Sequence, residues 1–176
     1  NYHNGKFVAT FLMGTKKLYD FVDNNPNVEM LPVSSVNHPL YAARNDNLVS
    51  INSCVQIDLT GQICSESVGA KQISGIGGQV DFIRSAALSK GGRSIIAIPS
   101  TAAHGTISKI VPRLDDDAVV TTSRTDVDCV ITEYGIAHLK GHTLRERARA
   151  LIEIAHPDFR EMLWTEFYRR FPAQAG

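Results

Sequence analysis

The sequence predicts an α/β fold built on an open, mostly parallel and partly mixed sheet that is covered by helices. First, short apolar and β-branched runs alternate with segments whose apolar residues have helical spacing. Second, a strand, a helix and a strand follow one another near the start, as in a right-handed βαβ unit with parallel strands. Third, loops rich in Gly and Pro follow the strands, where such sheets carry their sites.

The βαβ unit is expected first in the chain. Residues 6–13 are rich in β-formers and predict a strand. Residues 16–23 predict a helix with Phe21 facing inward, and residues 28–33 predict the second strand. Residues 34–47 are expected to form a loop with one helical turn, in which Pro39 takes the first helical position.

A hairpin is expected next. Residues 48–58 alternate well enough for one long strand, Thr60-Gly61 is a turn signal, and residues 62–65 return as the second arm. Further strands are expected at residues 93–98, 106–111, 119–122 and 127–132.

Two helices are expected at the C-terminal end. Thr143 and Glu146 have the spacing of a capping box, in front of a helix over residues 147–155. Its buried stripe is expected to contain Leu144, Ala148, Leu151 and Ile152. Pro157 starts a last helix over residues 158–170, whose apolar side chains are expected in the core or an interface: Phe159, Met162, Leu163, Phe167 and Phe171.

Composition narrows the function classes. The 176 residues are 43% hydrophobic and 20% charged, which is typical of one globular domain. The 18 basic and 18 acidic residues are mixed along the chain, which argues against a nucleic-acid surface and a polybasic membrane patch. With no apolar run near the length of a membrane helix and no signal peptide at the start, we expect a soluble cytoplasmic protein.

Residues 65–82 are the most informative stretch for function. They contain Gly69, Gly75, Gly77 and Gly78, followed by Asp81 as the expected N-cap of a short helix over residues 82–88. Unpaired amides that open onto a helix N-terminus suit an anion or a developing oxyanion. The spacing fits neither a dinucleotide fingerprint nor a P-loop, and a tight connection is the structural alternative.

The sequence does not indicate a metal site. Its three cysteines lack the Cys/His spacing of a zinc site, so we expect reduced, structural thiols. The acidic stretch Asp115-Asp116-Asp117 is expected to be a solvated turn.

Seven motifs follow one another along nearly the whole chain. They are Phe11-Leu12-Met13-Gly14-Thr15, Asn37-His38-Pro39, Asn52-Ser53 with Asp58-Leu59-Thr60-Gly61-Gln62, Gly75-Ile76-Gly77-Gly78-Gln79-Val80-Asp81-Phe82, Ile98-Pro99-Ser100-Thr101-Ala102, Thr132-Glu133-Tyr134-Gly135-Ile136-Ala137 and His156-Pro157-Asp158-Phe159-Arg160. In this order they resemble the acetyl-CoA hydrolase/transferase family. Within that family, the sequence is most similar to CoA-transferases that act on 4-hydroxybutyrate or on butyryl-CoA and acetate.

The resemblance implies that residues 1–176 form a single domain, the C-terminal half of a two-domain CoA-transferase. Such enzymes use a ping-pong route through a glutamyl-CoA thioester, and their nucleophilic glutamate lies upstream of the stretch seen here. No segment of residues 1–176 matches it. Glu66 is the tempting substitute, but we interpret it as a salt-bridged or solvated residue.

The resemblance also assigns roles to single residues. Asn37 matches a polar residue that supports the nucleophilic glutamate of the family, and Glu133 matches a second carboxylate near that glutamate. Gly78 matches a glycine whose amide contributes to the oxyanion site. The structural alternatives are a turn residue for Asn37 and a core-edge carboxylate for Glu133. The residues expected to bind CoA are Ser74, Gly77, Gly78, Gln79 and His104, the last at a position where relatives have lysine.

The implied ligands are acyl-CoA and small carboxylates as substrates, with no permanently bound cofactor. The implied partners are the protein's own N-terminal domain and a second copy in a homodimer or higher oligomer, with neither nucleic acid nor membrane. Acetyl-CoA hydrolysis is one alternative, and a non-catalytic module that binds CoA or only docks is another. A sugar-phosphate isomerase lacks a recognisable phosphate loop and acid/base pair.

Overall fold

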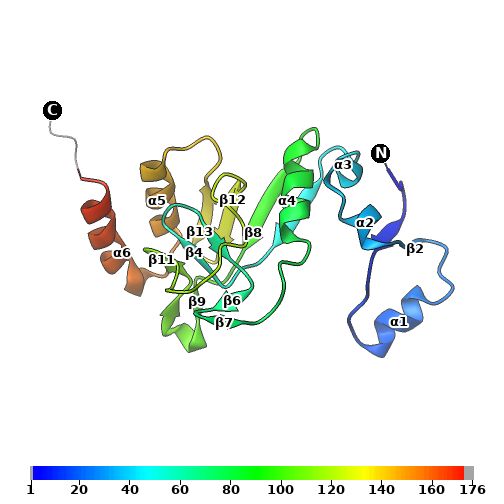
Figure 1. The fold of residues 1–176 in the computed structure, drawn as a ribbon, viewed down its shortest axis with the longest axis horizontal. Coiled ribbons are helices and arrows are strands. Elements are labelled where there is room, and N and C mark those ends of the chain that lie inside the picture. The colour runs from blue at the N-terminus through cyan, green and yellow to red at the C-terminus, as the bar shows by residue number, and fades with distance from the viewer. Residues whose placement is uncertain (1, 173–176) are drawn as a thin grey trace.

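The computed structural model describes residues 2–172 and is built around a four-stranded sheet with the order β13-β12-β8-β3. The strands are β3 (Val49–Asn52), β8 (Arg93–Ala97), β12 (Cys129–Thr132) and β13 (Gly135–His138). β3, β8 and β12 are parallel, and β13 runs antiparallel to β12 (Figure 1). The expected mostly parallel, partly mixed sheet is therefore confirmed.

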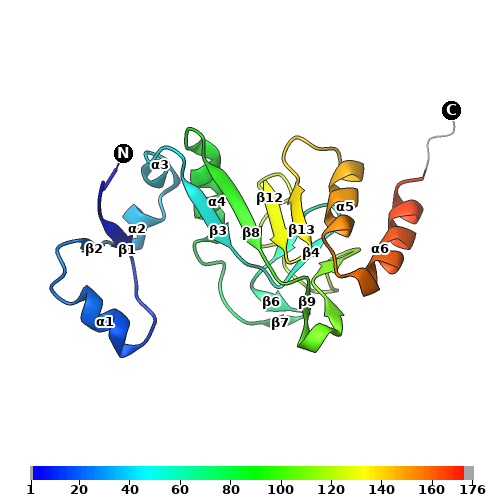
Figure 2. The same ribbon diagram turned by 180° about the vertical axis from the view of Figure 1, so that it is seen from behind.

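Helices pack against this sheet. α4 (Gln79–Leu88) contacts β3 and β8, and α5 (Leu144–Glu153) contacts β13. Ile83 of α4 and Ile96 of β8 are fully buried, because an amphipathic helix stabilises a parallel sheet by covering its apolar face. α6 (Pro157–Arg170) packs on α5 at the end of the molecule (Figure 2).

The expected βαβ unit is present but smaller than predicted. β1 (Phe7–Ala9) and β2 (Val28–Met30) are parallel, joined through α1 (Lys16–Val22). Phe21 does not face a core: it is exposed, and its ring meets that of Phe7 edge-on, with centroids 5.9 Å apart. Two strands and one helix have too little apolar surface to bury, and the unit lies at one end of the molecule (Figure 1).

Short helices lead from this unit to the main sheet. α2 (Val33–Val36) and α3 (Pro39–Ala42) occupy the stretch predicted as a loop with one helical turn. α3 begins with Pro39 in the first helical position, as predicted.

The predicted long strand over residues 48–58 is wrong. The chain forms β3, leaves the main sheet, and then forms β4 (Gln56–Asp58) in a second, three-stranded sheet with β5 (Ile63–Cys64) and β11 (Ile110–Val111). Alternation continues through the break, so the pattern does not reveal it. The hairpin of β4 and β5 is confirmed.

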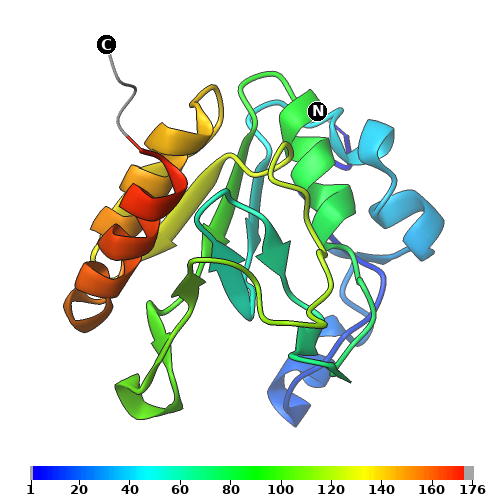
Figure 3. The same cartoon turned by 60° about the vertical axis from the view of Figure 1, so that its left-hand side comes forward.

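Other strands are also divided between sheets. The strand predicted over residues 106–111 is split into β10 (Ile107–Ser108), which pairs with β9 (Thr101–Ala102), and β11. β6 (Ser67–Val68) and β7 (Lys71–Gln72) form a small ribbon. Residues 119–122 form only a bridge from Thr122 to Ile63, and β13 was not predicted. Figure 3 shows these short ribbons below the main sheet.

Helix ends follow their capping residues. Thr143 and Glu146 form the predicted capping box, with the Glu146 amide 3.3 Å from Thr143 Oγ1. Leu144, predicted to be buried, is 40% exposed. Arg147 is buried instead, and its guanidinium donates to the carbonyls of His142 and Arg124 at 3.2 and 2.5 Å.

The core continues into α6. Leu163 and Phe167 are fully buried, Phe159 and Phe171 pack against the core, and Met162 is exposed.

All three cysteines are free and buried, and burial raises the pKa of Cys54 to about 12. Across residues 2–172, no helix has both the length and the apolar character that a membrane span requires.

Candidate active site

The carboxyl ends of three parallel strands form one edge of the sheet. The register aligns Asn52 with Ile96 and Ala97 with Ile131. Asn52 at the end of β3, Ser100 after β8 and Glu133 directly after β12 therefore belong to this edge. β8 lies between β3 and β12, and two strand spacings place their ends roughly 10 Å apart. Loops at such an edge are where open α/β sheets bind ligands.

One cavity of about 340 Å³ lies at this edge and is lined by Asn37, Asn52, Gly78 and Gln79, together with the end of β1. We call it the amide cavity. It brings together three of the predicted site residues, Asn37, Gly78 and Gln79. A Cβ atom on Gly78 would lie only 2.5 Å from Asn37 Nδ2, so glycine allows the amide of Asn37 to approach the start of α4.

The N-cap of α4 is Gly78, not the predicted Asp81, which lies in the first helical turn. The helix therefore begins three residues earlier than expected. Within residues 2–172 the amides of Gly77 and Gly78 donate no hydrogen bond, and Gly77 has a φ of +61°. Two free amides at the positive end of the helix dipole are an arrangement that binds an anion.

The side chains around these amides are held in different ways. Gln79 Nε2 donates to Thr122 Oγ1 at 3.0 Å, and Asn52 Nδ2 donates to Ser50 Oγ at 2.8 Å. The Asn37 side chain makes no hydrogen bond to the part of the chain that the structure describes. Its amide is therefore free to bond a group inside the cavity.

Glu133 lies after β12, at a second and more open cavity lined by residues 97–99 and 131–133. Ser100 holds both carboxylate oxygens: its amide donates to Oε2 at 2.8 Å, and its hydroxyl donates to Oε1 at 2.5 Å. The structural alternative for Glu133 is a carboxylate at the edge of the core. One of its two donors is a backbone amide, which fits that alternative, but the Glu133 side chain is exposed.

The electrostatics keep Glu133 ionised. Desolvation is the largest single contribution and raises its pKa, but the hydrogen bonds from Ser100 and its own backbone, with His156 nearby, together lower the pKa below the ordinary value. The neighbouring Tyr134 ring meets His156 edge-on at 5.4 Å and lies under the Arg160 guanidinium at 5.5 Å.

Three predicted site residues line neither cavity. Ser74 and Gly77 are exposed in the glycine-rich loop, and the Ser74 hydroxyl donates to the Gly75 carbonyl at 3.0 Å. His104 is exposed at the tip of the β9–β10 hairpin, with a φ of 55°.

Glu66 differs from its interpretation as a salt-bridged or solvated residue. It has no ion pair among residues 2–172. Its Oε1 accepts from Gln72 Nε2 at 3.2 Å, and its Oε2 is buried without a partner.

Sequence reasoning missed Ser100 and Asn52 as site residues. Ser100 is fully buried, and the signal that could have found it is a serine directly after the strand-ending Ile98-Pro99. Asn52 ends β3, where a polar side chain replaces the apolar alternation. In the described chain, no cluster of three or more His, Cys, Asp or Glu residues could hold a metal ion.

Comparison with known proteins gives consistent relatives. Residues 14–167 match the acetyl-CoA hydrolase/transferase C-terminal domain. The 4-hydroxybutyrate coenzyme A transferase of Clostridium kluyveri is 70% identical over 96% of this chain. The butyryl-CoA:acetate CoA-transferase of Anaerostipes caccae is 47% identical over 87% of it.

Solved structures agree with the fold. The 4-hydroxybutyrate CoA-transferase of Porphyromonas gingivalis has a TM-score of 0.80 at 50% identity, and RipA from Yersinia pestis has 0.88 at 49% identity. Each match covers 96% of this chain but only 38% of the solved chain, so the chain spans well under half the length of its relatives. Because the match extends over most of the chain at high identity, the chain belongs to the acetyl-CoA hydrolase/transferase family, in the part described as its C-terminal domain.

Proposed function

We propose that this chain is the CoA-facing domain of an acyl-CoA:carboxylate CoA-transferase of the 4-hydroxybutyrate type. The observation that carries the proposal is the amide cavity, where Gly78 lies beside the Asn37 side chain. Among residues 2–172, neither the Gly78 amide nor the Asn37 side chain has a hydrogen-bond partner. The relatives support the reaction class, because their names describe CoA transfer between different acyl groups.

In this proposal, a glutamate outside residues 1–176 supplies the nucleophile. Its carboxylate attacks the thioester carbonyl of an acyl-CoA, and the released CoA thiolate then attacks the glutamyl carbonyl, which frees the first carboxylate and leaves a glutamyl-CoA thioester. A second carboxylate reverses these steps. Each attack develops an oxyanion, and one preorganised amide donor lowers such a barrier by about 3 kcal/mol.

The described residues divide this work. The Gly78 amide donates to the oxyanion, and the Asn37 amide orients the nucleophilic carboxylate. Glu133, which Ser100 keeps ionised, is the second carboxylate of the site. The exposed loop with Ser74, the adjoining Gln79 and the more distant His104 are the proposed contacts of CoA, and a neutral imidazole binds phosphate more weakly than lysine does.

Steric closure of the amide cavity tests the proposal. In the full-length protein, Gly78→Ala should lower exchange between butyryl-CoA and labelled acetate about 100-fold, because the new Cβ displaces Asn37. Gly75→Ala is the matched control, since a Cβ there meets nothing within 4 Å. Equal exchange in both variants, with folding verified by circular dichroism, would contradict the proposal.

Hydrolysis is the second candidate, because an acetyl-CoA hydrolase from Candida albicans is 33% identical over 89% of this chain. The same assay separates the two reactions. A transferase releases free CoA slowly and forms labelled acetyl-CoA, whereas a hydrolase releases CoA at the same rate with or without acetate.

A further inference from the structure

The amide cavity is lined both by the end of β1 and by Asn52, the last residue of β3. β3 is the last strand of the four-stranded sheet, and β1 belongs to a separate two-stranded sheet with β2. Two-stranded parallel sheets are rarely stable alone, and parallel sheets are normally covered on both faces. Here Ile51 on β3 is 68% exposed, and Phe7 on β1 is also exposed.

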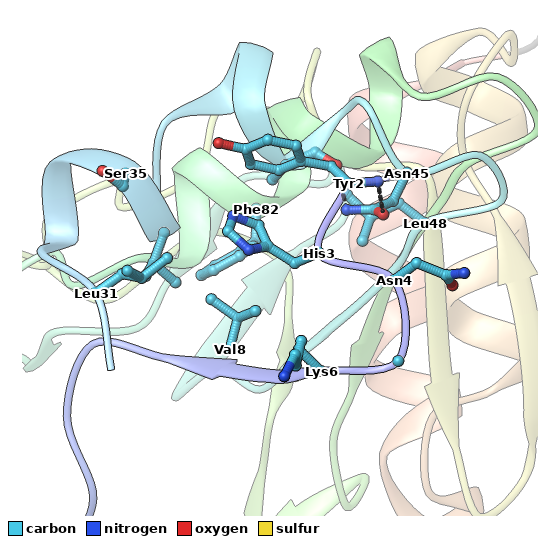
Figure 4. Close-up of a pocket in the computed structure, with 13 residues that line it drawn as sticks. Tyr2, His3, Asn4, Lys6, Val8, Leu31, Ser35, Asn45, Leu48 and Phe82 are labelled. Atoms are coloured by element: carbon cyan, nitrogen blue, oxygen red, sulfur yellow. Dashed lines mark hydrogen bonds between the residues drawn. The ribbon is translucent and has the colours of Figure 1, made fainter. Parts of the chain in front are cut away.

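Two adjoining cavities lie between β1 and β3, and together we call them the slot. A cavity of about 360 Å³ lies at the amino ends of both strands, where Lys6, Val8, Leu48 and Phe82 line it (Figure 4). The amide cavity lies at the carboxyl ends. Val8 and Phe82 line both cavities, which therefore adjoin.

β1 and β3 run in the same direction along this slot. The residues that precede each strand, Lys6 and Leu48, line the first cavity, whereas Thr10 and Asn52 line the amide cavity. A strand placed between them could therefore be parallel to both. Such a strand would lie about 4.8 Å from each neighbour.

The free peptide groups point into the slot. The Phe7 amide donates to the Asn27 carbonyl at 2.8 Å, and the Ala9 carbonyl accepts from the Leu31 amide at 2.9 Å. The peptide groups of residues 7 and 9 therefore point toward β2. Because alternate residues of a parallel strand bond to opposite sides, the peptide groups of Val8 face the slot.

The same alternation applies to β3. The Leu48 carbonyl accepts a hydrogen bond from the Arg93 amide at 2.9 Å, so the peptide groups of residues 48, 50 and 52 point toward β8. The peptide groups of Val49 and Ile51 therefore lie on the open edge of β3. Apolar walls at Val8, Leu31 and Phe82 suit the side chains of an inserted strand.

We propose that this slot receives one β-strand of the longer polypeptide, parallel to β1 and β3, which joins both sheets in the order β2-β1-insert-β3-β8-β12-β13. The occupant is assigned to the same polypeptide because the relatives carry more than half of their length outside the matched part. Covalent linkage gives such a strand a millimolar effective concentration.

The inserted strand ends at the candidate site. Its carboxyl end opens onto Asn37, Asn52 and Gly78 in the amide cavity. This step rests on the proposed function: a glutamate at or just beyond the end of the strand would meet the free amides there, and the strand would place the missing nucleophile.

Hydrogen exchange in the full-length protein tests the insertion. The amides of Val8 and Ile51 should exchange at least about 100-fold more slowly than that of Ile136, the internal control on the opposite outer edge of the same sheet. The Ile98 amide donates to the Ile131 carbonyl, so the peptide groups of Ile131 face β8 and those of residues 130 and 132 face β13. Ile136 is paired with Ile131, so its amide points away from β12, to the outer edge of the sheet.

The outcomes separate the structural claim from the chemical one. Exchange at Val8 and Ile51 as fast as at Ile136 would overturn the insertion, and protection lost on dilution to monomers would assign the slot to a second copy. Borohydride reduction after incubation with butyryl-CoA, followed by mass spectrometry, locates the reacting glutamate. If the amides are protected but the reduced glutamate lies far from the protected strand, the insertion stands. That result would overturn the claim that the inserted strand carries the nucleophile.

Discussion

At the scale of single residues, the proposed site combines two kinds of group. Its donors have no hydrogen-bond partner among residues 2–172, and its carboxylate, that of Glu133, accepts hydrogen bonds at both oxygens. Gly78 and Asn37 are free to bond a ligand, while Ser100 occupies both oxygens of Glu133. A free donor can stabilise charge that develops during a reaction, whereas a bonded carboxylate has a fixed position and a fixed charge.

Replacing Ser100 with alanine removes its hydroxyl, which donates to Glu133 Oε1 at 2.5 Å. The pKa of Glu133 should rise toward its ordinary value, because that bond favours the ionised form. Exchange activity should fall about tenfold at neutral pH. The measurement is the pH profile of kcat for the full-length enzyme.

The sign of the pH effect follows from the lowered pKa. With Ser100 present, Glu133 stays ionised and contributes to exchange activity until the pH falls through its lowered pKa. In Ser100→Ala that pKa is higher, so activity should begin to fall at a higher pH. Ser94→Ala is the matched control, since the buried Ser94 hydroxyl has no hydrogen-bond partner among residues 2–172. An unchanged acid limb in Ser100→Ala would contradict the role of Ser100.

At the scale of elements, α5 and α6 stabilise the domain by capping and by burial. The capping box of α5 satisfies amides of its first turn through Thr143. α6 contributes Phe167, which is fully buried beneath the guanidinium groups of Arg145 and Arg149, at 5.1 and 5.6 Å from its ring.

Thr143→Ala should lower the free energy of unfolding by about 1 kcal/mol, because it removes the N-cap oxygen of α5. Urea denaturation of the full-length protein measures this change. Thr165→Ala, which removes an exposed hydroxyl from the middle of α6, is the control and should change stability little. Equal effects of both substitutions would contradict the capping role.

Phe167→Ala should cost about 4 kcal/mol, the usual range for a fully buried aromatic ring in a core. Tyr168→Ala, at the exposed neighbouring position, should cost far less. Thermal unfolding of both variants checks the difference. A Phe167→Ala protein as stable as Tyr168→Ala would show that α6 is not part of the core.

Sequence reasoning predicted those elements that local chemistry determines. The capping box at Thr143 and the Pro39 helix start were both found, because each signal lies within a few residues. The strand over residues 48–58 was predicted wrongly, because the alternation of apolar residues does not record that the chain changes sheets after Asn52. Sheet membership is a property of tertiary pairing, and sequence pattern alone does not contain it.

At the scale of the whole molecule, the proposed function makes the described chain one side of an active site. Family resemblance predicted Asn37, Gly78 and Gln79, and the structure places them in one cavity. It also predicted Ser74 and His104, which lie outside both cavities. In the proposed function, those two positions depend on the path that CoA would take over the surface, and neither periodicity nor spacing determines that path.

The relatives explain why the site is open on one side. They are more than twice the length of the matched part, and the slot between β1 and β3 includes the amide cavity. The amides of this domain and the carboxylate of an inserted strand would together complete a CoA-transferase site.

The most direct test is a crystal structure of the full-length protein trapped as its glutamyl-CoA thioester. The account predicts that the thioester carbonyl oxygen lies about 3 Å from the Gly78 amide nitrogen, with Asn37 beside the glutamyl group. A thioester bound away from the amide cavity, with the Gly78 amide bonded to protein or left in solvent, would contradict it.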